Sequence, residues 1–141
     1  MLAKSSYPQE YIDGARAQIA ARISAFDALS KAVGKGGAVA LADFETLYFN
    51  DLVFVLDVFF THRTRGVEGK NGNPINEVRV LTMSFLENGG HLGVDSTIKL
   101  KPETSVLGLQ VGDEIKLTAA DFTRLADAYF DEMDSRFGAK A

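Results

Sequence analysis

Apolar residues recur at steps of three and four near both ends of the chain, the spacing that places side chains on one face of a helix. We predict a first amphipathic helix from Pro8 to Val33, because the glycine-rich run 34–37 that follows favours a helix end. The apolar face of this helix comprises Ile12, Ala15, Ile19, Ile23, Phe26, Leu29 and Val33.

A second periodic stretch closes the chain. Thr118 and Asp121 form a predicted capping box, with Asp in place of the more usual Glu, so a final amphipathic helix is expected to begin there. The outer face of this helix is acidic. Its apolar face comprises Phe122, Leu125, Ala126, Tyr129, Phe130, Met133 and Phe137.

The most hydrophobic stretch lies between these helices and reads FETLYFNDLVFVLDVFF from Phe44 to Phe60. A helix that is apolar on nearly every side must be covered over most of its circumference. We therefore predict that this segment is either the central helix of the domain or an oligomer interface. The helix should begin between residues 38 and 43 and end near Thr61.

A third helix is predicted after the glycine-containing loop that follows. Asn73 and Pro74 are typical of an N-cap and a first helical turn, since proline loses no needed hydrogen bond at that position. The run Asn88-Gly89-Gly90 should end this helix. The residues expected to be buried along it are Ile75, Val78, Leu81, Phe85 and Leu86.

Residues 91–117 differ in character from the rest of the chain. The segments 97–100, 106–109 and 114–117 are short, partly alternating and separated by turn residues, which indicates a small β-hairpin or short sheet. The predicted fold class is therefore mainly α (α+β). It is a single globular domain over residues 1–141, a four-helix domain packed around its apolar central helix, with the hairpin or short sheet before the last helix.

Composition removes several classes of function. The chain has no Cys and only two His, which excludes disulfides, thiolate nucleophiles and multi-histidine metal sites, so we expect no metal and no cofactor. The net charge of -4 argues against a general nucleic-acid binder. No apolar run approaches the roughly 20 residues that span a bilayer, and no signal-peptide pattern opens the chain, so a cytoplasmic location is expected.

One segment is locally basic. Residues 62–79, HRTRGVEGKNGNPINEVR, contain four Arg or Lys residues and two Glu residues, so their local net charge is 4 - 2 = +2. Guanidinium groups and the free N–H groups at a helix N-terminus both suit anions. The candidate anion-binding residues are His62, Arg63, Arg65, Lys70 and Arg79. The same arginines can instead pair with Glu68, Glu77 or Asp57, or lie at the carbonyl end of the preceding helix.

Asn50, Asp51 and Asp57 interrupt the apolar helix. Asn50 and Asp57 are separated by seven residues and therefore share a face, so we treat them as candidate buried polar residues. A buried Asp57 must be neutral, paired or hydrogen-bonded, and Arg63, Arg65 or Arg79 is the expected partner. The pair would then fix how the helix docks, or would form part of a binding site.

Two runs of the sequence carry a resemblance. FFTHRTRGVEGKNGNPINEVRVL and IKLKPETSVLGLQVGDEIKLTAADF resemble a small uncharacterised bacterial protein family of about this length. The resemblance covers most of the chain after the first helix. It implies a protein of unknown function and assigns no activity, cofactor or site residue.

Three functions remain open. The first hypothesis is a non-enzymatic cytoplasmic interaction or scaffold protein that homo-oligomerises, because the chain has excess hydrophobicity and no catalytic residue pattern such as Gly-x-Ser-x-Gly. The second is a binder or enzyme for a small anionic metabolite, using the basic loop with His62 as acid or base. The third is a winged-helix-like DNA binder, which the acidic total and the lack of a basic recognition helix disfavour.

Overall fold

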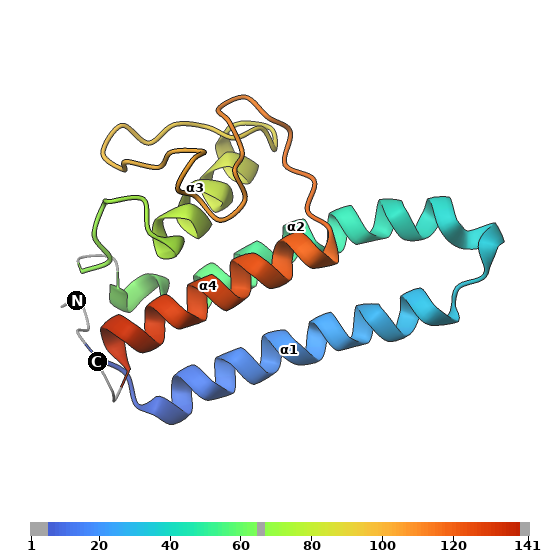
Figure 1. Ribbon diagram of the computed structural model, residues 1–141, viewed down its shortest axis with the longest axis horizontal. Helices are drawn as coiled ribbons and strands as arrows, with labels where there is room; N and C mark the ends of the chain where they lie inside the picture. Colours follow the sequence, from blue (N-terminus) through green and yellow to red (C-terminus); the bar gives the residue numbers. More distant parts are fainter. Residues whose placement is uncertain (1–5, 65–66, 139–141) are drawn as a thin grey trace.

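A computed structural model describes residues 6–64 and 67–138, without the side chains of residues 61–64. The described chain is mainly helical, and α1 runs antiparallel to α2 and α4 (Figure 1). The elements are α1 (Gln9–Ala32), the short 3-10 helix η1 (Lys35–Gly37), α2 (Ala38–Thr64), α3 (Pro74–Glu87) and α4 (Ala119–Phe137). The four predicted helices are thus confirmed within the described residues.

Two helices share the central position. α2 packs against α1, α3 and α4, as its hydrophobicity predicts, and α4 equally packs against all three of the others. The hairpin of α1 and α2 extends beyond the first residue of α4, and α3 lies on the other side of the bundle (Figure 1). Beyond the start of α4 the two long helices have only each other to pack against. Most of the core therefore lies in the other half of the hairpin.

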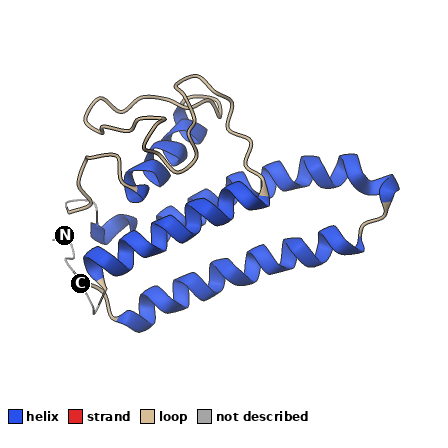
Figure 2. Ribbon diagram, in the orientation of Figure 1, coloured by secondary structure: helices blue, strands red, loops and turns tan. Residues whose placement is uncertain are grey.

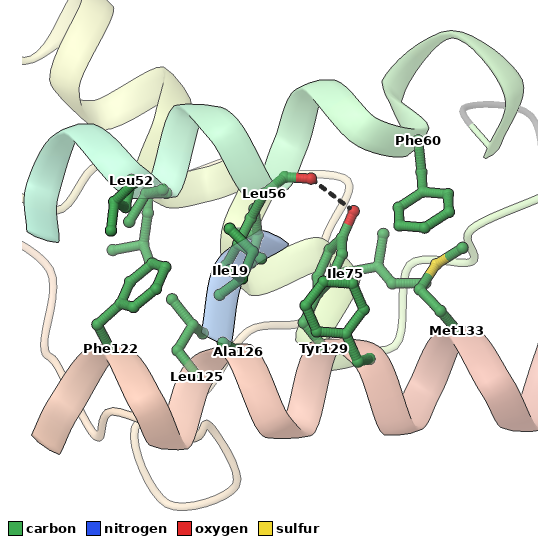
Figure 3. Packing of buried hydrophobic residues seen from close by; sticks show 14 of the residues in the cluster. Ile19, Leu52, Leu56, Phe60, Ile75, Phe122, Leu125, Ala126, Tyr129 and Met133 are labelled. Carbon is green, nitrogen blue, oxygen red and sulfur yellow. Dashed lines mark hydrogen bonds between the residues drawn. The ribbon is translucent and has the colours of Figure 1, made fainter. Parts of the chain in front are cut away.

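The core is formed by aliphatic and aromatic side chains from all four helices (Figure 3). Phe122, Leu125 and Tyr129 of α4 point towards Leu52 and Leu56 of α2, and the Tyr129 hydroxyl donates to the carbonyl oxygen of Leu56 at 3.1 Å. Burying large apolar groups of this kind is the main favourable contribution to folding. The apolar face predicted for α4 is buried at every position.

Two predicted core residues differ from expectation. Leu29, in the last turn of α1, is 43% exposed. Leu86, in the last turn of α3, is 66% exposed, whereas Ile75, Val78 and Leu81 of the same helix are buried. Periodicity identified the apolar face correctly, but the length over which a neighbour covers that face depends on the packing of the other helices.

Helix ends follow local chemistry closely. The side chain of Asn73 accepts a hydrogen bond from the Asn76 N–H at the start of α3, and Pro74 occupies the first turn. At the start of α4, Thr118 and Asp121 form both hydrogen bonds of the capping box. α2 continues to Thr64, three residues past the predicted end. None of the helices in the described part combines the length and hydropathy required to cross a membrane.

The predicted β-hairpin is wrong. Among the described residues there is no strand, and residues 88–118 form an irregular segment with one isolated bridge between His91 and Glu114 (Figure 2). The expected alternation is present at 114–117, where Ile115 and Leu117 are buried and Glu114 and Lys116 are exposed. The alternation of apolar and polar residues therefore indicates that one side of the segment is buried. It does not show that the segment pairs with another strand.

Side chains replace the missing strand. The amide of Asn50 on α2 donates to the carbonyl oxygen of Ile115 at 2.8 Å and accepts from the N–H of Leu117 at 3.1 Å. A neighbouring strand would make the same pair of contacts with these backbone groups. Buried backbone groups need partners. Because a helix residue supplies them, this segment is held without a sheet.

Replacing Thr118 with Ala is expected to lower the free energy of unfolding by about 1 kcal/mol, because the first turn of α4 loses its side-chain cap. Urea denaturation followed by circular dichroism measures the change. Thr104→Ala is the matched control, since Thr104 is exposed and its side chain has no hydrogen-bond partner among the described residues. Equal losses in the two variants would contradict the capping role.

Candidate functional site

The loop between α2 and α3 is tied to the start of α3 by two asparagines. Asn73 donates to the carbonyl oxygen of Glu68 at 2.8 Å, and Asn76 donates to that of Gly69 at 2.9 Å. The Asn76 side-chain oxygen also accepts from the N–H of Gly72 at 3.0 Å. A Cβ at Gly72 would lie 2.5 Å from the carbonyl oxygen of Lys99, and φ there is +87°, so only glycine fits. Residues 67–73 are therefore held firmly over the helix start.

This arrangement brings Glu68 against Arg79 of α3. The two side chains form a bidentate ion pair, with Nε to Oε1 at 2.7 Å and Nη2 to Oε2 at 2.6 Å, and they are only 10% and 11% exposed. Arg136 of α4 donates to the carbonyl oxygens of Val67 and Glu68. The pair thus joins the loop to α3, and Arg136 joins it to α4. Planar, bidentate geometry of this kind is specific to arginine.

Other ionisable groups lie close to this pair. Burial would lower the pKa of the Arg79 guanidinium, but its hydrogen bonds to the Glu68 carboxylate and the negative charges of Glu68 and Asp57 outweigh burial, so the pKa is raised. Burial raises the pKa of Tyr129 well above its ordinary value, and the negative charge of Asp57 acts in the same direction. Arg79 and Tyr129 therefore keep their ordinary protonation at neutral pH.

Glu77 is a second buried carboxylate on α3. Its two oxygens accept hydrogen bonds from the N–H groups of Val106 at 2.8 Å and Leu107 at 3.0 Å. Burial raises the pKa of Glu77, while those two hydrogen bonds and the nearby charge of Arg124 act against the rise. The sequence suggested Glu77 as a partner for an arginine. The structure shows that it instead holds the backbone of the irregular segment.

The structure accounts for only some of the predicted site residues. His62, Arg63 and Arg65 lie outside the described side chains, so the anion site that they would form stays a prediction. Lys70 is exposed and Arg79 is paired with Glu68, one of the partners suggested from sequence. Asn50 and Asp57 are each half-buried. Asn50 contacts the backbone of residues 115–117, the structural role that the sequence left open.

A pocket of about 410 Å³ lies on the outer face of α3. One wall is the helix and the other is the segment 93–96, so we call it the α3 pocket. Sequence analysis missed it, because no local pattern shows that residues 93–96 return to α3. No group of three or more His, Asp or Glu residues suited to a metal occurs among the described residues. The pocket is lined by Arg79, Val80, Met83, Ser84, Glu87, Asn88, Gly93, Val94, Asp95 and Ser96.

A second feature is a mostly apolar strip on α2 that its neighbours cover only in part. It consists of Phe44, Leu47, Asp51, Phe54 and Val58, which we call the α2 stripe. The steps of three and four between these residues average 3.5, the repeat of a coiled-coil seam. Phe44, Leu47 and Val58 are exposed, and Phe54 is half-buried with its ring 5.6 Å from that of Phe85 on α3. The stripe extends over roughly 21 Å of helix.

Comparison with known proteins gives no match to any protein-family model, curated protein or solved structure. The resemblance to a bacterial family therefore stays a prediction. Function has to be argued from the pocket and the stripe themselves.

Replacing Arg79 with Met is expected to lower the free energy of unfolding by about 3–5 kcal/mol, because the charge of Glu68 is left buried without its partner. The double variant Glu68→Leu, Arg79→Met should lose less free energy of unfolding than Arg79→Met, since it removes both charges of the pair and leaves neither one buried alone. Chemical denaturation measures both. Lys31→Met, which breaks an exposed pair with Asp27, is the control and should change little. A double variant at least as unstable as Arg79→Met would contradict this account.

The raised pKa of Glu77 predicts a pH effect. The folded state binds this proton more tightly than the unfolded state, so protonation of Glu77 stabilises the folded state. This stabilisation is fully present below about pH 4.5, the ordinary pKa, and is lost as pH rises through the raised pKa of the folded state. Relative to Glu77→Gln, which does not titrate, the wild type should therefore gain stability as pH falls towards 4.5. Denaturation at a series of pH values measures this. If the wild type instead loses stability relative to Glu77→Gln as pH falls, the two hydrogen bonds outweigh burial in setting the pKa of Glu77.

Proposed function

We propose that this protein is a non-enzymatic interaction or scaffold protein that homo-oligomerises through the α2 stripe. The observation that carries the proposal is the exposure of Phe44, Leu47 and Val58 at coiled-coil spacing on α2, whose other faces pack against α1, α3 and α4. Exposed apolar surface that forms a continuous strip is typical of an interaction site, whereas isolated apolar residues are common on any protein. A cytoplasmic location, expected from the sequence, is part of the same proposal.

The spacing of the stripe favours a second copy of the chain as the occupant. Phe44 and Val58 lie seven residues on either side of Asp51, and Leu47 and Phe54 lie four and three residues from it. Two antiparallel α2 helices related by a two-fold axis at Asp51 would place Phe44 opposite Val58 of the second copy. Leu47 would lie opposite Phe54. Such an interface uses the same surface on both subunits, which is the commonest symmetry of homo-oligomers.

Asp51 limits the strength of this association. At the two-fold axis its carboxylate would face the same group of the second copy, and like charges directly opposite each other are destabilising. A single polar residue in a coiled-coil seam fixes register at a cost in stability. The proposed oligomer is accordingly a weak dimer with a defined register.

The two alternatives have less support in the described residues. An anion site built on Arg79 has to compete with Glu68, which already occupies two guanidinium nitrogens. A winged helix requires a hairpin beside the recognition helix, and residues 88–118 form none. Neither alternative explains the exposed α2 stripe.

Replacing Leu47 with Lys is expected to shift the protein to a monomer, because a lysine in the seam loses apolar contact and adds charge. Analytical ultracentrifugation over a range of protein concentrations measures the dimer dissociation constant. Val111→Lys is the control, since Val111 is also 66% exposed but lies in the irregular segment. Circular dichroism should show unchanged helicity in both variants.

Asp51→Asn extends the same experiment. Removing the facing charges should tighten a self-associating dimer several-fold, by roughly 1 kcal/mol. A different partner carrying a basic residue opposite Asp51 would instead bind this variant more weakly. A wild-type protein that stays monomeric at millimolar concentration would rule out the homo-oligomer.

A further inference from the structure

The α3 pocket has two walls of different origin. Val80, Met83 and Glu87 belong to the outer face of α3, and Val94 and Asp95 belong to the segment opposite. The second wall is fixed in place, because the N–H of Gly93 donates to the Ser84 hydroxyl at 2.9 Å and the Asn88 amide donates to the carbonyl oxygen of His91 at 2.8 Å. The cavity is therefore preformed, as ligand sites usually are.

Its walls carry more negative than positive charge. The charged lining residues are Arg79, Glu87 and Asp95, which sum to 1 - 2 = -1. Adding Glu68, which pairs with Arg79, and Lys70, which acts electrostatically on Asp95, leaves 2 - 3 = -1. The one guanidinium in the wall is already neutralised by its carboxylate partner. The field in the pocket therefore favours a cation.

Two of the residues that line the pocket carry carboxylates with capacity for a ligand. Within the described residues, Glu87 has no hydrogen-bond or ion-pair partner. Asp95 uses only Oδ1, which accepts from the N–H and the hydroxyl of Thr97 at 2.9 and 2.6 Å. The two carboxylates lie on opposite walls, and the apolar side chains of Val80, Met83 and Val94 lie in the same lining. A complementary ligand would therefore carry positively charged ends and an apolar middle.

We propose that the α3 pocket binds a small aliphatic amine, with ammonium groups at Glu87 and Asp95 and the alkyl chain against Val80, Met83 and Val94. An ammonium group donates to carboxylate oxygens through charge-assisted hydrogen bonds. The methylene chain gains by leaving water for apolar side chains. This proposal stands apart from the dimer, because it uses α3 and residues 93–96 and none of the α2 stripe.

Methionine methyl resonances test the proposal directly. The chain has three methionines; Met83 lines the pocket, and Met133 is fully buried in the core and serves as internal reference. Titration of methyl-labelled protein with 1,5-diaminopentane at constant ionic strength should move the Met83 signal saturably, with a Kd on the order of 1 mM. The Met133 signal should stay in place. Glutarate and 1,5-pentanediol, with the same chain length but negative or no charge, should move neither signal.

Conservative variants identify the binding groups. Glu87→Gln and Asp95→Asn each remove one charge at nearly constant shape, and Asn keeps an oxygen for the contact with Thr97. Each should raise the Kd for the diamine roughly fivefold, the upper range for a solvent-exposed charge pair. Glu103→Gln makes the same charge change at an exposed position outside the pocket lining and should leave the Kd within about twofold.

Three outcomes would overturn the proposal. The first is a Met83 signal that does not move with the diamine. The second is an equal response to glutarate, which would point to an anion site at Arg79. The third is a rise in the Kd for the diamine in Glu103→Gln as large as that in Glu87→Gln, which would show non-specific attraction of the diamine to an acidic protein. Thermal unfolding of each variant confirms that it is folded before its Kd is compared.

Discussion

Residues 88–118 make no regular secondary structure, yet they pack on the helices, and this imposes the main constraint on the fold. Leu92, Ile115 and Leu117 of this segment are buried in the core, so the adjoining backbone also leaves water. Polar backbone groups that leave water require hydrogen-bond partners. Backbone groups of the segment supply some of them, as where the Ile115 N–H donates to the carbonyl oxygen of Gly90, and side chains of the helices supply others. Asn50 contacts residues 115 and 117, and Glu77 contacts residues 106 and 107.

The same constraint explains the unusual polar content of the helices. α2 carries Asn50 within an apolar run, and α3 buries Asn76 and Glu77 on a face that periodicity alone would assign to apolar residues. Each of these side chains contacts backbone outside its own helix. They are polar because the neighbouring segment is irregular. When the sequence of either helix is considered alone, these polar residues resemble candidates for an active site.

Charge in the described core is used in a similar way. Glu68 and Arg79 lie close to Asp57 and Tyr129, but the ion pair joins the loop before α3 to that helix, and Arg136 connects the loop to α4. Among the described residues, structural roles thus occupy Asn50, Glu77 and Arg79, which the sequence offered as candidates for binding or ion pairing. The α2 stripe and the α3 pocket lie on different elements. The proposed self-association and the proposed ligand binding therefore use different surfaces.

The sequence by itself determined the four helices and most of their ends, because caps and periodicity act over a few residues: Asn73 with Pro74 started α3, and Thr118 with Asp121 started α4. The end of α2 lies three residues beyond the predicted one. The sequence also excluded cysteine chemistry. Only the tertiary structure decided that residues 114–117 pair with Asn50 rather than with a strand, and that Arg79 pairs with Glu68. The bond between Asn50 and Ile115 joins residues 65 apart, and that between Glu77 and Val106 joins residues 29 apart. Contacts over such separations leave no local pattern in the sequence, and for the same reason neither the exposed face of α2 nor the α3 pocket could be assigned before the helices were packed together.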